Sequence, residues 1–156
     1  MIYHSKQSVR KFLHIGSIAV LCLFNSDNLY ADIDDNEQYR IGQYYYIAGN
    51  YEAAIKAFSG AVVAAPEIST YHHWLGRSYG QLAKKSGPFK AYSLSQKTRE
   101  SLERAVELDR ENTAALSDLM KFYEQAPAFL GGGQEKAREI RKRLEELENQ
   151  ADNTEG

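Results

Sequence analysis

The chain has 156 residues, a formal net charge of −2 and a single cysteine, Cys22. This length supports one modest domain and leaves little room for a second. Because the net charge is acidic, and a duplex binder needs clustered Lys and Arg to neutralise phosphates, the composition argues against a nucleic-acid partner.

The amino-terminal segment has the order of a secretory signal peptide. Three basic residues precede an apolar run at 12–24, and this run is shorter than the roughly 20 apolar residues that span a bilayer. We predict cleavage after Ala31, so that residues 1–31 are a signal peptide. The protein is then exported, either periplasmic or secreted, with no stable membrane insertion after cleavage.

Lipid attachment at Cys22 is a competing fate of this segment, although the bulky Leu21 occupies the place of a small residue in a lipoprotein signal. Cleavage after Ala31 removes Cys22, and it changes the net charge to −4 because three basic residues and one acidic residue are lost. The remaining chain has no thiol for a disulfide or a thiolate metal site, so its stability must come from packing alone.

A repeat of 34 residues organises the domain that we predict at 32–150. The string Ile41-Gly42-Gln43-Tyr44-Tyr45 aligns with Leu75-Gly76-Arg77-Ser78-Tyr79, which places the two glycines 34 positions apart. We expect each repeat to be two antiparallel helices. The units lie at about 35–68, 69–112 and 113–149.

The first unit has the most regular pattern. Small residues, Gly42 and Ala54, allow its two helices to approach closely, and the large side chain of Phe58 fills the seam together with Tyr45. The pair Gly49-Asn50 supplies the turn between the helices. The other two aromatic residues of the Tyr44-Tyr45-Tyr46 run point about 100° away on either side and are expected to be partly exposed.

The second unit is longer than the first. Gly76 and Ala105 are 29 positions apart, whereas the equivalent Gly42 and Ala61 are 19 apart, so about ten residues are inserted. We predict that the extra residues form a loop near 84–90.

The third unit begins near Thr113 and is interrupted by a loop at 125–133. Its second helix starts around Gln134 and has one narrow apolar stripe on an otherwise polar surface, as expected of a helix that caps a repeat array. Residues 151–156 are predicted to be a disordered tail.

These phased features resemble the tetratricopeptide repeat (TPR) family, and the segment at 125–133 is similar to one found in exported bacterial TPR proteins. The resemblance implies an all-α fold, a right-handed superhelix of about three helical hairpins. It also implies a scaffold or adaptor that binds a protein or peptide in a concave groove.

The resemblance places the groove on the first helix of each unit. Tyr39 and Tyr46 are its candidate aromatic anchors and Arg77 and Lys121 its positive points, although such residues can also form an ordinary solvated face. The Lys and Asn residues with which one TPR subtype holds a carboxy-terminal carboxylate are absent. The full predicted partner-binding set is Asn36, Tyr39, Gln43, Tyr46, Thr70, His73, Arg77, Gln81, Ser117, Lys121 and Glu124.

Other motifs carry weaker functional hypotheses. Phe129 and Leu130 form a second candidate contact loop, and the glycines at 131–133 precede a helix but lack a Walker pattern for anion binding. The neighbouring His72 and His73 diverge on a helix, so we predict no metal site.

We expect neither an enzyme nor a cofactor, because the chain has no nucleophile elbow, HExxH helix or phosphate loop. Two alternatives to the scaffold remain open. One is a module that binds a small ligand or cell-wall fragment, and the other is a self-associating subunit that forms a homo-oligomer.

Overall fold

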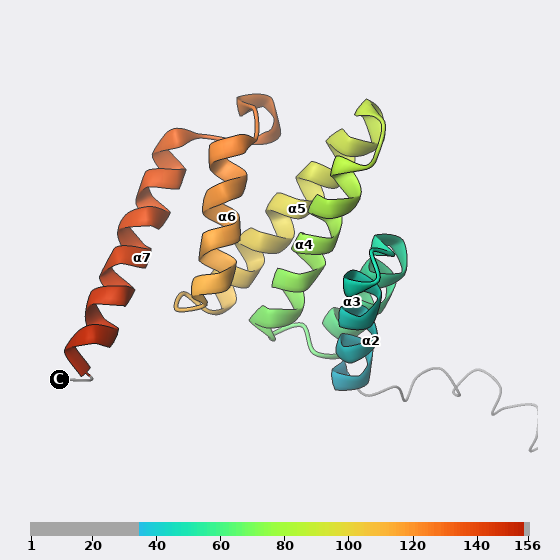
Figure 1. Ribbon diagram of the computed structural model, residues 1–156, viewed down its shortest axis with the longest axis horizontal. Coiled ribbons are helices and arrows are strands. Elements are labelled where there is room, and N and C mark those ends of the chain that lie inside the picture. The colour runs from blue at the N-terminus through green and yellow to red at the C-terminus, as the bar shows by residue number, and fades with distance from the viewer. Residues whose placement is uncertain (1–34, 155–156) are drawn as a thin grey trace, which may run out of the picture. The chain divides into compact units, whose positions relative to one another are not determined.

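The computed structural model describes residues 35–154, and the predicted signal peptide lies outside this range (Figure 1). All regular structure within it is helical, which confirms the all-α prediction. The elements are α2 (Asp35–Ile47), α3 (Tyr51–Ala64), α4 (Ser69–Lys84), α5 (Pro88–Leu108), α6 (Thr113–Gln125), the 3₁₀ turn η1 (Ala128–Leu130) and α7 (Gln134–Thr154).

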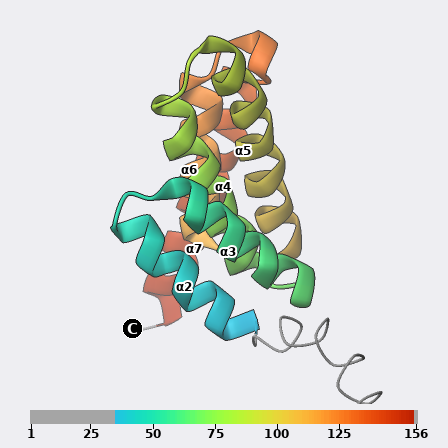
Figure 2. The ribbon, with the colours of Figure 1, turned by 90° about the vertical axis from the view of Figure 1, so that its right-hand side faces the viewer.

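Each helix packs on the next along the chain, and successive helices run in opposite directions. In Figures 1 and 2, α2 and α3 lie side by side at one end of this row and α7 lies at the other. Helix α4 also contacts α2 on one side and α6 on the other. One surface is therefore built from every second helix.

The predicted turn joins α2 to α3. Gly49 has a φ of 75°, a left-handed conformation that glycine adopts without steric cost. Asn50 follows as the N-cap of α3, where its side-chain oxygen accepts a hydrogen bond from the Ala53 amide at 3.2 Å. These two residues reverse the chain and start the second helix.

The seam between α2 and α3 depends on the missing side chain of Gly42. The Phe58 ring is fully buried and lies so close that a Cβ on Gly42 would be 2.5 Å from Phe58 Cε1. Phe58 in turn stacks on Trp74 of α4, with 5.8 Å between the ring centroids. One phenyl ring therefore joins the first hairpin to the second, and Tyr45 packs against the same cluster.

The ten extra residues of the second unit lie in helix, so the predicted loop at 84–90 is wrong. Helices α4 and α5 hold 16 and 21 residues, which is ten more in sum than the 13 and 14 of α2 and α3. Only residues 85–87 separate α4 from α5. Pro88 starts α5 because its fixed φ suits the first helical position.

The glycine segment between α6 and α7 is an internally bonded turn. The amides of Gly131, Gly132 and Gly133 donate to the carbonyls of Ala128, Pro127 and Tyr123. No amide of the three is left to cradle an anion, which disfavours the anion-binding reading of this segment.

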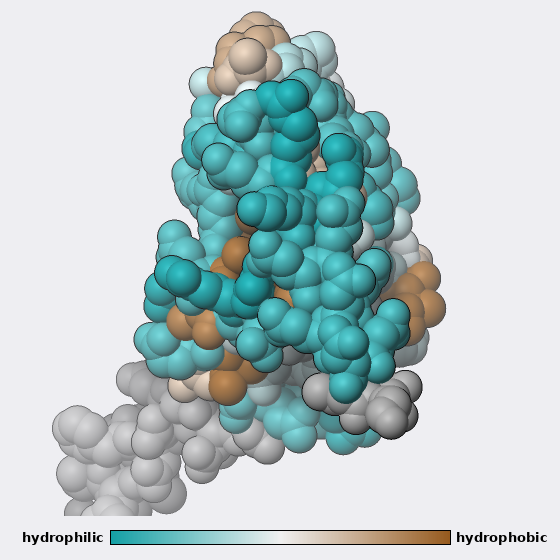
Figure 3. Space-filling model, turned by 90° about the vertical axis from the view of Figure 1, so that its left-hand side faces the viewer, coloured by the Kyte–Doolittle hydropathy of each residue, from teal (hydrophilic) through white to brown (hydrophobic). Residues whose placement is uncertain are grey.

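Helix α7 is the last helix of the row, and its outer face is polar and exposed to solvent. Ala137 is fully buried and Ile140 packs beside it, whereas the exposed side of the helix is hydrophilic (Figure 3). The disordered tail predicted from Ala151 is wrong as far as Thr154, because α7 continues to that residue. The Asn153 side chain donates to the Asn149 carbonyl one turn earlier.

We predict that Gly42→Ala destabilises the protein by about 1–3 kcal/mol, because the new methyl group has to displace the buried Phe58 ring. The measurement is the free energy of unfolding in urea. Gly80→Ala is the matched control. Its Cβ would meet Thr98 Cγ2 at an ordinary 3.4 Å, so helix propensity should stabilise this variant by up to about 1 kcal/mol. Equal effects at the two positions would contradict the packing account.

Candidate binding groove

A groove with a volume of about 440 Å³ lies between α4, α5, α6 and the segment around η1. Its lining combines cationic, polar and apolar side chains. The residues are Tyr46, Gly76, Arg77, Gly80, Gln81, Ala83, Lys84, Ala91, Ser95, Thr98, Leu102, Asp118, Lys121, Phe122, Gln125, Ala126, Pro127 and Leu130.

Asp118 of α6 is the electrostatic centre of this groove. Its carboxylate accepts a hydrogen bond from His73 Nε2 at 2.9 Å and pairs with Arg77 Nε at 3.4 Å and with Lys121 Nζ at 3.6 Å. The His73 hydrogen bond holds the pKa of Asp118 below its ordinary value, although partial burial opposes this shift. The carboxylate is therefore charged at neutral pH and already has cationic partners.

Arg77 of α4 is fixed by contacts to all three hairpins. Its guanidinium carbon lies 4.5 Å from the centroid of the Trp74 ring and 5.1 Å from that of Tyr46, and its Nε faces Asp118. Cation–π and ionic contacts of this kind restrict a side chain that is otherwise highly flexible. The groove therefore presents a positive charge in a fixed position.

The structure brings together part of the predicted partner-binding set. Tyr46, Arg77, Gln81 and Lys121 line the groove, whereas His73 is buried behind it against Asp118. Leu130 of the predicted contact loop also lines it.

The other predicted residues lie elsewhere. Tyr39 packs among aromatic rings, where burial raises the pKa of its hydroxyl, and this hydroxyl accepts a hydrogen bond from Gln43 Nε2 at 2.9 Å. Glu124 pairs with Arg141 of α7. Besides His73, the predicted residues outside the groove lining are Asn36, Tyr39, Gln43, Thr70, Ser117, Glu124 and Phe129.

Several residues that line the groove were not predicted from the sequence. Asp118 lies next to the predicted Ser117, but no local signal distinguishes it from a solvated helical acid. Ser95 and Thr98 come from α5, the second helix of its unit, which the family pattern does not assign to a groove.

The histidine pair has no metal-site geometry. His72 Nε2 lies 2.8 Å from the Pro66 carbonyl, and His73 is occupied by Asp118. In the range 35–154, no three His, Cys, Asp or Glu residues are grouped so as to hold a metal ion. Within the same range, no helix has the length and apolarity needed to cross a bilayer.

Comparison of the chain with protein-family models and with curated proteins found no match. Function is therefore inferred from the geometry of the groove and from the sequence pattern.

We predict that Asp118→Asn lowers the free energy of unfolding by about 1 kcal/mol at pH 7, because a charge-assisted bond to His73 becomes a neutral one. Because the pKa of Asp118 is lowered in the folded protein, its ionised form stabilises the fold at pH values above 3.8, the ordinary pKa of the group. This stabilisation is lost as the pH falls through the lowered pKa, so wild type and variant should converge in acid. Urea unfolding between pH 2 and 7 measures the difference. Asp152→Asn, at the exposed end of α7, is the control. A decrease in the free energy of unfolding of Asp118→Asn that is the same at every pH would contradict the prediction.

Proposed function

We propose that this chain is an exported TPR-like scaffold, a right-handed superhelix of three helical hairpins, that binds a protein or peptide in the groove. The observation that carries the proposal is the fixed Arg77 guanidinium beside an apolar wall, on the helices that the repeat assigns to partner binding.

Contacts between repeat units support the TPR-like arrangement. The Tyr71 hydroxyl of the second unit donates to Asp35 of the first at 2.8 Å, whereas the Ser69 hydroxyl donates to the Ala105 carbonyl at 2.8 Å within the second unit. The Asn112 side chain donates to Ser69 at 2.9 Å, which links the starts of α4 and α6. Contacts between the starts of successive first helices are expected where each unit packs on its neighbour.

The charges of the groove favour a ligand that carries carboxylates. Three basic residues line it, Arg77, Lys84 and Lys121, against one acidic residue, Asp118. The chain as a whole has the opposite sign of net charge. Opposite charges on partner and groove increase the association rate and select against wrong partners.

The length of the groove favours a peptide segment. Arg77 and Lys84 are seven residues apart on α4, or about 10 Å along the helix axis, which matches roughly three residues of extended chain. Leu102, Phe122 and Leu130 provide an apolar surface beside these cations. We therefore propose a partner segment in which acidic residues flank an apolar one.

The volume of the groove is also compatible with a second candidate function, the binding of a small molecule. About 440 Å³ also falls within the range of pockets for small molecules, so a charged cell-wall fragment is the alternative ligand. The proposal in either case is binding without chemistry, because the groove carboxylate of Asp118 is engaged by cations.

A photo-crosslinking side chain at Gln81 should capture the partner in an envelope fraction, whereas one at the exposed Lys142 of α7 should not. The combined Lys84→Ala and Lys121→Ala variant should lower the yield at Gln81 about fivefold, because partly exposed ion pairs contribute roughly 0.2–1 kcal/mol each.

Equal capture at Gln81 and Lys142, or an unchanged yield in the lysine variant, would refute the peptide groove. Mass spectrometry of the purified protein distinguishes the alternative, since a co-purifying glycan fragment that Lys121→Ala abolishes would favour the small ligand.

A further inference from the structure

Positive charge is concentrated in the second repeat unit. From Ile68 to Arg99 the sequence has no Asp or Glu, although the chain has 21 acidic residues in total. The basic residues of this stretch are Arg77, Lys84, Lys85, Lys90, Lys97 and Arg99.

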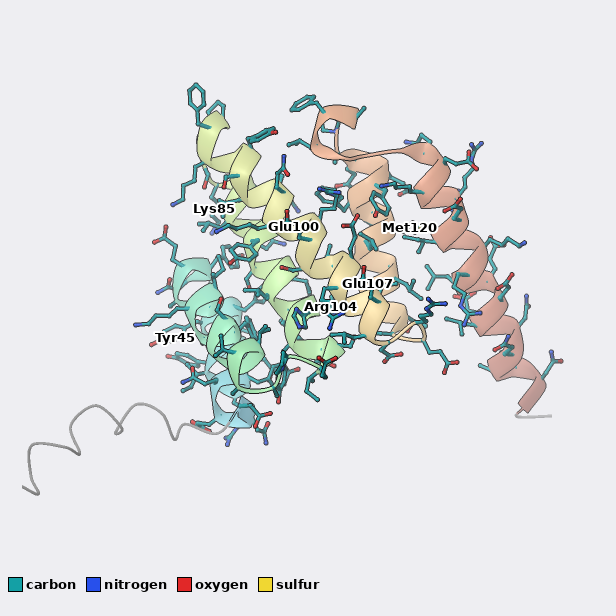
Figure 4. The ribbon with its side chains drawn as sticks, turned by 180° about the vertical axis from the view of Figure 1, so that it is seen from behind. Tyr45, Lys85, Glu100, Arg104, Glu107 and Met120 are labelled. Carbon is teal, nitrogen blue, oxygen red and sulfur yellow. The ribbon has the colours of Figure 1, made fainter. Side chains whose placement is uncertain are left out.

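Three of these lysines lie at the end of the α4–α5 hairpin. Lys84 and Lys85 end α4, and Lys90 is in the first turn of α5; Figure 4 shows Lys85 near this end. Lys90 Nζ pairs with Glu52 at 2.8 Å, and Lys85 Nζ lies 4.6 Å from the centroid of the Tyr51 ring. Glu52 is the facing carboxylate on α3, and all three lysines remain exposed.

Exposed aromatic rings accompany these lysines. Phe89 at the start of α5 is 94% exposed, and Phe129 of η1 is 71% exposed. The Phe129 ring stacks on Tyr92 at 6.4 Å with only 6° between the ring planes, so η1 and the start of α5 form one surface. Both segments lie at the same end of the helices, where Figure 3 shows hydrophobic atoms. We name this surface the tip patch, formed by Lys84, Lys85, Phe89, Lys90, Tyr92 and Phe129.

We propose that the tip patch docks on an anionic lipid surface. Its lysines would attract lipid phosphates, and Phe89 and Phe129 would enter the boundary between headgroups and acyl chains. Neither signal is strong alone, but an apolar anchor combined with a basic cluster gives stable peripheral attachment. The proposal does not depend on occupation of the groove.

The composition of the tip patch favours lipid over protein as the occupant. Lysine is depleted at protein–protein interfaces, and the aromatic anchors of such interfaces fill desolvated pockets. Here a nearly fully exposed phenyl ring stands at a helix end among three lysines. Aromatic and basic residues side by side are instead typical of surfaces at the membrane–water interface.

Co-sedimentation of the full chain with vesicles tests the attachment. Binding should be strong to vesicles of equal parts phosphatidylglycerol and phosphatidylcholine, weak to phosphatidylcholine alone, and reduced by salt. Lys85→Gln with Lys90→Gln should weaken binding about fivefold per lysine, and Phe89→Ala about tenfold. These three residues do not line the groove, so a failure here leaves the peptide proposal standing.

The matched control variants make the same kinds of substitution at exposed positions outside the tip patch. Val63→Ala changes an 83% exposed apolar residue at the far end of α3, and Lys142→Gln changes an exposed lysine of α7. Both should bind vesicles like the wild type. Urea unfolding should show equal stability for all variants, because each altered side chain is largely exposed.

A local measurement separates the tip patch from the apolar amino-terminal run. In vesicles with brominated acyl chains, the tryptophan introduced by Phe89→Trp should be quenched, whereas that introduced by Val63→Trp should not, with Trp74 as the common background. Absence of vesicle binding, equal binding to neutral vesicles, or equal quenching at the two positions would overturn the proposal.

Discussion

The close approach of paired helices at two glycines is the constraint on which the rest of the structure depends. The Phe58 ring occupies the space of a Gly42 side chain, and Leu102 also lies close to Gly76, where a Cβ would be 2.9 Å from Leu102 Cγ. The second contact has a consequence beyond stability, because Gly76 and Leu102 both line the groove. The seam that joins α4 to α5 is therefore also the floor of the proposed binding site, and a larger residue in the seam would fill the groove as well as strain the core.

Arg77 connects the aromatic cluster of the first hairpin to the charges of the third. Its guanidinium lies against the neighbouring rings of Trp74 and Tyr46, and its Nε pairs with Asp118. The carboxylate is in turn oriented by the buried His73. No single pair of this network contributes much to stability at a partly exposed site. Their joint effect is to fix one cation in position before a ligand arrives, which reduces the entropy cost of binding.

The sequence predicted those features that depend on local chemistry. The turn at Gly49-Asn50 follows from residue type, whereas the groove positions of Arg77 and Lys121 follow from the resemblance to the TPR family. Spacing revealed ten extra residues but not whether they form loop or helix, although Pro88 at the first position of α5 is a helix-start signal. Asp118 and the ring cluster around Tyr39 could not be predicted, because their burial depends on side chains distant in the sequence, such as His73 and Tyr71.

The stretch of the second unit without acidic residues contributes lysines to both the groove and the tip patch. It can do so because adjacent residues on a helix point about 100° apart. Lys84 lines the groove, while its neighbour Lys85 lies over Tyr51 and belongs to the tip patch alone. The groove also reaches Pro127 and Leu130, which flank Phe129. If the tip patch rests on lipid, this end of the groove faces the headgroups, and the Lys84 end of a partner segment would bind near an anionic surface. That surface repels free acidic peptides, so the geometry favours partners that are themselves held at the membrane.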